Sequence, residues 1–135
     1  MTATREVLDS LAIESSVDLG KLATAVEALL EVERTTMACA GAMVGEGDSS
    51  ALMDAIRADL DTVDVVHAAR SVLTRFVGTN VSVVRAELNA AIAALERSNA
   101  ECARHAEHHG HCRLCASATS AGITASRDLL GALGA

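Results

Sequence analysis

Small and apolar residues recur at alternating steps of three and four along four long stretches of this chain, at about residues 19–44, 50–77, 80–107 and 111–133. This spacing gathers them on one stripe of an α-helix, the surface through which neighbouring helices pack. The 135 residues include no proline, which would interrupt such helices. The pattern therefore predicts four long helices and argues against sandwiches and barrels.

Each helix would contribute one seam of residues to the core. Asp59 is the one charged residue on the seams whose side chain lies among apolar positions, and we expect it to face solvent or pair with an arginine, or else to contact a histidine. The four seams are Leu22, Ala25, Leu29, Val32, Thr36, Cys39 and Met43; Leu52, Ala55, Asp59, Thr62, Val66, Ala69, Leu73 and Phe76; Val84, Leu88, Ala91, Leu95, Ser98, Cys102 and His105; and Cys112, Cys115, Thr119, Gly122, Ser126, Leu129 and Leu133.

Long helices joined by short connections are typical of an antiparallel up-down-up-down four-helix bundle. We therefore predict an all-α fold in a single domain over residues 1–135, with the bundle at about 19–134 and a short additional N-terminal helix at about 4–14. Gly78 would end the second long helix. The short helix would bury Val7, Leu8 and Leu11, and the expected caps are Thr4 for that helix, Asp48 or Ser49 for the second long helix and Thr79 or Asn80 for the third.

All four cysteines and four of the five histidines lie near one end of this predicted bundle, which we call the mouth. Three of the cysteines and those four histidines fall within residues 102–115. Because consecutive helices are antiparallel, Cys39 and Met43 at the end of the first long helix would reach the same mouth. The sequence thus predicts that its sulfur atoms and imidazoles gather in one place.

These residue types indicate a soft-metal site. The Cys102–His105 and Cys112–Cys115 spacings let one helical turn chelate an ion, which alone would suggest Zn(II), but thiolates near a thioether select Cu(I) as readily. A helix start also favours the thiolate forms of Cys112 and Cys115. We expect sulfur ligation by Cys39, Cys102, Cys112 and Cys115, imidazole ligation by His105, and completion of the coordination or inward transfer of the ion by Met43, His108 or His111, with His67 and His109 at the surface.

Composition argues against several other functions. The formal charge of −7 and the single aromatic residue disfavour nucleic-acid binding, which needs clustered Lys and Arg. No apolar run approaches the roughly 18 residues that span a bilayer, so we expect no membrane association and a cytoplasmic location, where cysteines stay reduced. The seams carry no Glu and the chain no Glu-x-x-His motif, so a di-iron enzyme is disfavoured, and we expect no catalytic activity.

Several stretches of the chain together resemble the cytosolic copper storage proteins: Ile56–Asp61, Asn80–Arg85 and above all Ser98–Ala116, with similarity from about Lys21 onward. The resemblance implies a four-helix bundle whose cysteine-lined lumen holds many Cu(I) ions, an access route for copper at the mouth, and assembly into homotetramers.

The chain departs from that family along most of the lumen. We therefore predict reduced storage capacity, with one ion or a small cluster of up to about four at the mouth. The open alternatives are a structural Zn(II) site, a redox protein using Cys112 and Cys115, and a scaffold without a metal. The positions that lack the family's cysteines are Leu29, Val32, Thr36, Met43, Ala55, Thr62, Val66, Leu88, Ala91, Leu95, Ser98, Thr119, Gly122 and Ser126.

Overall fold

The computed structural model describes residues 2–10, 17–47, 49–76 and 78–133, and all regular structure within these ranges is helical, which confirms the predicted all-α class. None of the described helices is long and apolar enough to cross a bilayer. The elements are α1 (Ala3–Ser10), α2 (Leu19–Val44), the short 3-10 helix η1 (Ser49–Leu52), α3 (Met53–Thr74), α4 (Val81–His105) and α5 (Gly110–Ala132).

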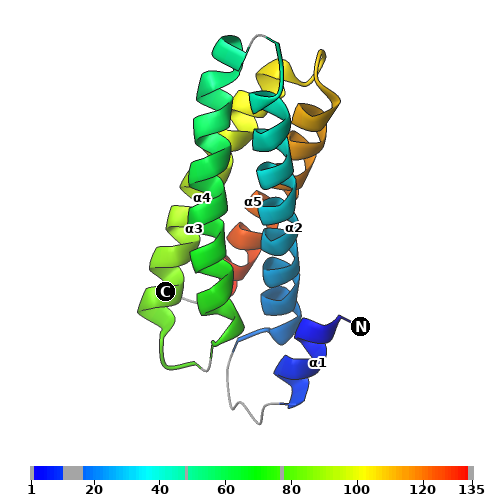
Figure 1. Ribbon diagram of the computed structural model, residues 1–135. Helices are drawn as coiled ribbons and strands as arrows, with labels where there is room; N and C mark the ends of the chain where they lie inside the picture. Colours follow the sequence, from blue (N-terminus) through cyan, green and yellow to red (C-terminus); the bar gives the residue numbers. More distant parts are fainter. Residues whose placement is uncertain (1, 11–16, 48, 77, 134–135) are drawn as a thin grey trace.

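The four long helices form the predicted antiparallel bundle (Figure 1). Helix α2 packs against α3 and α5, and α4 packs against the same two helices from the other side. The α2–α3 and α4–α5 connections lie at one end, the mouth, while α1 packs beside the start of α2 at the opposite end (Figure 1). The predicted meeting of the cysteine-bearing helix ends is therefore confirmed.

Local hydrogen bonds explain where the helices begin and end, and they differ from the expected side-chain caps at Thr4 and Asn80. Asp18 caps α2 by accepting from the backbone N–H groups of Gly20 and Lys21 at 2.9 and 3.2 Å. The 3-10 turn of η1 precedes α3, whose start lacks a side-chain cap; Asn80 stands at the start of α4 but its side chain makes no capping bond. Gly78, with φ 85°, closes the α3–α4 connection.

The N-terminal helix differs from its prediction at the start. The Thr2 hydroxyl, not that of Thr4, accepts from the Arg5 backbone N–H at 3.2 Å, and Thr4 lies inside the helix. Leu8 is buried as expected, whereas Val7 is exposed. The predicted end at residue 14, and Leu11, lie outside the described residues, as do Asp48 and Val77.

The seam prediction is confirmed: every seam residue is buried except His105 and Leu133, which are half-buried. Most of the buried apolar residues fall into two clusters. The larger one, the apolar core, fills the end away from the mouth and includes Leu22, Leu29, Val32, Val66, Leu73, Phe76, Leu88, Leu95 and Leu129. The smaller one, the mouth cluster, consists of Cys39, Met43, Leu52, Ala55, Ile56, Cys102, Cys112 and Cys115.

Candidate metal centre

Each of the four long helices contributes one donor to a buried group that we call the inner site. Cys39 comes from α2, Asp59 from α3, Cys102 from α4 and Cys115 from α5, and their donor atoms all lie within 4.8 Å of one another. All four cysteines are free thiols. The Cys102 and Cys115 sulfurs are 3.3 Å apart, and they lie 3.4 and 3.5 Å from Asp59 Oδ1.

Asp59 corrects a prediction, because its carboxyl group neither faces solvent nor pairs with an arginine or a histidine. It is fully buried, and Oδ1 accepts from the Ser98 hydroxyl at 2.7 Å and from the thiols of Cys102 and Cys115. Oδ2 is buried without a hydrogen-bond partner among the described residues. A buried carboxylate oxygen left unpaired is costly, and a metal ion is one partner that would satisfy it.

The inner site has a marked acid–base asymmetry. Burial raises the pKa of Asp59 to about 7, against a bond from Ser98 that lowers it. The Cys102 thiol donates to the Cys115 sulfur, which raises the pKa of Cys102 and lowers that of Cys115; hydrogen bonds to Cys102 and Cys115 also raise the pKa of Cys39. Neighbouring thiols thus stabilise a first negative charge on sulfur and oppose further charges in the absence of a cation.

Cys112 forms a second group nearer the mouth. Its sulfur lies 4.0 Å from Cys39 Sγ and 3.5 Å from His111 Nδ1, and Cys39 Sγ lies 3.4 Å from the same nitrogen. Burial raises the pKa of Cys112 to about 11, which is opposite to the expected effect of its place at the start of α5. Desolvation outweighs the helix dipole here because the side chain is fully buried.

His111 faces two chemical environments. While Nδ1 points to the sulfurs of Cys39 and Cys112, Nε2 lies 2.9 Å from Glu46 Oε1, and that oxygen is also 3.2 Å from His109 Nδ1. The two imidazole rings lie 5.4 Å apart. The sequence predicts His109 at the surface, but its ring is half-buried in this cluster. The hydrogen bonds from His111 and His109 lower the pKa of the Glu46 carboxyl group.

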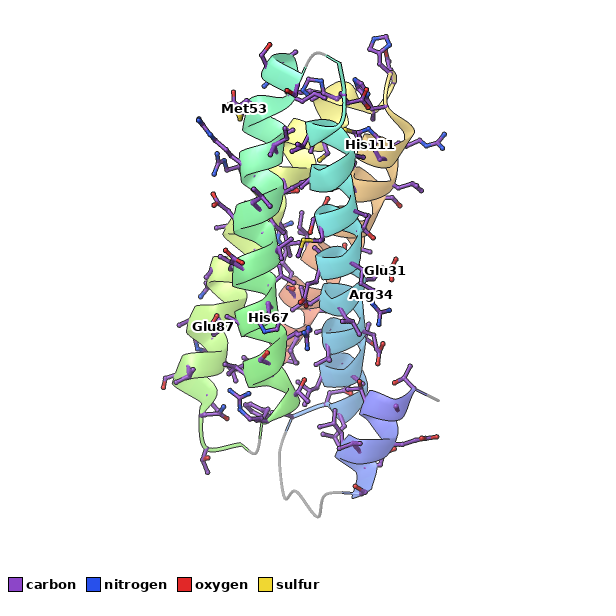
Figure 2. All side chains as sticks on the ribbon, in the orientation of Figure 1. Glu31, Arg34, Met53, His67, Glu87 and His111 are labelled. Carbon is purple, nitrogen blue, oxygen red and sulfur yellow. The ribbon has the colours of Figure 1, made fainter. Side chains whose placement is uncertain are left out.

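The remaining candidate ligands occupy different surroundings. Met43 is fully buried in the mouth cluster. The His105 ring is half-buried and lies 6.3 Å from the ring of His109, while His108 is exposed; neither imidazole is hydrogen-bonded to a thiol in the described part of the chain. His67 lies at the surface far from His111 (Figure 2), 2.8 Å from a carboxylate oxygen of Glu33, as expected.

Sequence reasoning missed three residues of these groups: Asp59 as a possible ligand, Glu46 and His109. A signal for Asp59 existed, since it is a charged residue at a core position, and the cost of burying it predicts a partner. Glu46 and His109 lie in the two mouth connections, where no helical period fixes a direction. Their approach depends on how the two connections pack together.

The donors have the character of a soft-metal site. Thiolates that share an ion, at about 2.3 Å from the metal, lie roughly 4 Å apart, close to the sulfur separations of 3.3 and 4.0 Å seen here. The three thiols and the carboxyl group of the inner site thus fit Cu(I) or Zn(II) after small displacements, as do the thiols of Cys39 and Cys112 with the imidazole of His111.

Comparison with known proteins identifies relatives of this chain. The family model described as "Csp: Copper storage protein" matches residues 19–131. No curated protein sequence matches the chain. Among solved structures, the copper storage protein Ccsp of Streptomyces lividans, loaded with 10 copper equivalents, is 34% identical with a TM-score of 0.93, covering 96% of this chain and 98% of that one.

Two further structures of the Streptomyces lividans protein are similar. A variant with one histidine replaced by alanine is 37% identical with a TM-score of 0.86, covering 89% of this chain and 100% of that chain. A cytosolic copper storage protein carrying five coppers is also 37% identical, with a TM-score of 0.81 and coverage of 83% of this chain and 93% of that one.

Proposed function

Since the chain belongs to the copper storage protein family, we propose that it binds Cu(I) at the mouth of its bundle, in the cytosol, and holds fewer ions than a bundle with a cysteine-lined lumen. The observation that carries the proposal is the inner site, where three buried thiols and the buried carboxyl group of Asp59 converge from four helices. A Cu(I) ion would offset the charges that now oppose one another there.

The proposed ligands follow the depth of the site. Cys39, Cys102 and Cys115 would bind copper in the inner site, with Asp59 as an additional oxygen donor or a stabiliser of the cluster charge. Cys112 and His111 would hold an ion nearer the mouth, and because Cys39 touches both groups its thiolate could bridge them. Met43, His105 and His108 remain predicted ligands or transfer residues.

Capacity is limited by what fills the bundle beyond the inner site. Besides Ser98, three threonines on the other helices, Thr36, Thr62 and Thr119, have buried hydroxyl groups. Each threonine hydroxyl donates to the backbone carbonyl four residues earlier in its own helix. The apolar core follows. Neither layer offers soft ligands, so we propose one ion or a cluster of up to about four.

An anaerobic Cu(I) titration of the reduced protein against a chromogenic chelator tests this function, with native mass spectrometry to count the ions. We expect tight uptake of at most about four ions, lost when Cys39, Cys102 and Cys115 are replaced by serine. The matched control is His67→Gln, which removes an exposed histidine remote from the mouth. Uptake that survives the triple replacement would contradict the inner site.

The separate contributions of Met43 and His105 need single replacements. Met43→Leu keeps the buried volume and removes the sulfur, and Met37→Leu is its matched control because Met37 lies 54% exposed on the same helix. A weaker Cu(I) affinity in Met43→Leu alone would make Met43 a ligand. For His105→Gln, the control is His67→Gln, at an exposed position remote from the mouth.

A structural Zn(II) site is the second candidate, because three thiolates and a carboxylate also form a complete tetrahedral set. Parallel titration with Zn(II) distinguishes the two: a structural ion would raise the unfolding temperature strongly, while negligible Cu(I) retention beside tight Zn(II) binding would overturn the copper proposal. Failure to retain either ion would favour the redox or scaffold alternatives. We propose no catalytic role for this chain. Its organisation as a single domain and its assembly into a homotetramer stay predictions.

A further inference from the structure

The mouth carries a donor set that differs chemically from the thiols below it. Glu46 follows α2 in the first mouth connection, while His109 and His111 stand at the start of α5. One carboxylate oxygen and one nitrogen from each ring lie within 4.8 Å of one another. None of these three atoms is sulfur, and one is an anionic oxygen, so Cu(I) is a poor match for the set.

We propose that Glu46, His109 and His111 form a second metal site, which takes a borderline divalent cation such as Zn(II). Two imidazoles and one carboxylate are a common protein donor set for Zn(II). In a tetrahedral site with ligands at about 2.0–2.2 Å, donor atoms lie roughly 3.3–3.5 Å apart. The Glu46 oxygen is already 2.9 and 3.2 Å from the two nitrogens, so a small outward movement would admit the ion.

The backbone holds these three residues in place before any ion arrives. The Glu46 N–H donates to the carbonyl of Met43 at 3.1 Å, which closes the turn after α2. The His109 N–H donates to the carbonyl of His105 at 3.0 Å, while the His109 carbonyl accepts from the N–H groups of Cys112 and Arg113 in the first turn of α5. Fixed backbone positions reduce the cost of ordering the ligands when they bind.

The proposed site also interacts with the thiols through His111. A neutral imidazole has one lone pair for a metal, so an ion on Nε2 leaves the proton on Nδ1. Nδ1 would then donate to Cys39 or Cys112 and could not ligate copper. A divalent ion at the mouth would therefore slow Cu(I) uptake, a consequence that rests on the proposed copper function, whereas the divalent site itself does not.

Co(II) and Zn(II) binding to the reduced full-length chain tests the site. We expect one Co(II) equivalent per chain that adds no sulfur-to-cobalt charge-transfer absorption, present in the wild type and absent from Glu46→Gln and His109→Gln. In competition with a chromogenic chelator, these variants should release the corresponding Zn(II) at least tenfold more readily. His67→Gln, which removes an exposed histidine remote from the mouth, is the matched control and should bind as the wild type does.

Three outcomes would overturn the divalent site: no sulfur-free equivalent in the wild type, full retention in Glu46→Gln, or sulfur charge transfer from the ion that the variants lose. Circular dichroism checks that the variants keep their helices. The rate of Cu(I) uptake, measured with and without added Zn(II), should fall in the wild type and not in Glu46→Gln. If the protein took up no Cu(I) at all, the cobalt spectra would still decide the divalent site.

Discussion

Asp59 places a carboxyl group at a position where the other helices contribute thiols to the same site. Its burial has a consequence for stability in the absence of metal. Folding raises the pKa of Asp59 from 3.8 to about 7. Between these two pH values the carboxyl group is therefore protonated in the folded chain and ionised in the unfolded chain. The unfolded state then binds fewer protons, so stability is highest below the unfolded pKa and falls as the pH rises through about 7.

We therefore expect Asp59 to lower the stability of the metal-free protein between about pH 4 and pH 7, by at most about 4 kcal/mol. Asp59→Asn should remove most of that slope. Chemical denaturation across this range in the presence of a chelator measures it. Asp61→Asn is the matched control, since Asp61 is an exposed partner of Arg97 two residues along the same helix. An equal slope in wild type and Asp59→Asn would refute the assignment.

Ser98 lies between the inner site and the buried hydroxyls of Thr36, Thr62 and Thr119. Its Oγ lies 3.9 Å from Cys115 Sγ and 2.7 Å from Asp59 Oδ1. A thiol in its place would adjoin the existing sulfurs, so Ser98→Cys should raise the copper count in native mass spectra by about one ion. Ser126→Cys is the control, because Ser126 is equally buried but lies beside the apolar core. Equal counts in both variants would contradict this placement of Ser98.

For single residues, the sequence predicted burial better than it predicted the contacts of the buried side chains. Residue spacing determines the buried face of a helix, and Cys39, Cys102 and Cys115 were placed correctly by that argument. The contacts of Asp59 with Ser98, Cys102 and Cys115 involve two other helices, so they depend on relative helix height as well as on facing. The spacing of seam residues does not determine how far one helix is shifted along the bundle axis relative to its neighbour to within one turn.

The helices themselves illustrate the same limit at a larger scale. Helix α2 begins and ends where the pattern predicts, because Asp18 caps its start and Gly45 follows its end. The second long helix, predicted at about residues 50–77, is shorter in the structure, since η1 occupies its first turn and α3 ends at Thr74. Leu52, the last residue of η1, is 2% exposed and packs in the mouth cluster.

Gly122 gives the packing of α5 a testable feature. A Cβ atom at this position would lie 2.9 Å from Val32 Cγ2 and 3.3 Å from Leu95 Cδ2. Valine is stiff in a helix, so Gly122→Ala should destabilise the fold by about 1 kcal/mol despite the better helix propensity of alanine. In a Val32→Ala background the same change should become stabilising.

Denaturant unfolding of these variants measures both effects as a mutant cycle. Gly131→Ala is the control in the same helix, because nothing lies within 4 Å of a Cβ atom there. It should be neutral or stabilising by up to about 1 kcal/mol. If Gly122→Ala were as stable as Gly131→Ala, the contact between α5 and α2 would be looser than described.

The whole bundle combines two parts that stabilise it differently. Away from the mouth, leucine, valine and Phe76 pack into the apolar core, which needs no ion. At the mouth, four thiols and a carboxyl replace part of that packing. The up-down arrangement of these parts was predictable, because short connections force consecutive helices to be antiparallel.

Copper should therefore protect one end of the molecule more than the other. We expect hydrogen exchange to slow on Cu(I) loading in the last turns of α2 and α4 and the first turns of α3 and α5, with little change around Leu29 and Leu88. Mass spectrometry of peptides from the two ends, with and without metal, measures this. Uniform protection along all four helices would indicate that the two ends unfold together.

The apolar core also affects the order in which ions move. Leu29, Val32, Leu95 and Gly122 leave the far end without soft ligands, and the close approach around Gly122 fills the space between α2, α4 and α5. The bundle is thus a blind-ended vessel. An ion that reaches the inner site through the mouth must return the same way, so the last copper to arrive is the first to leave.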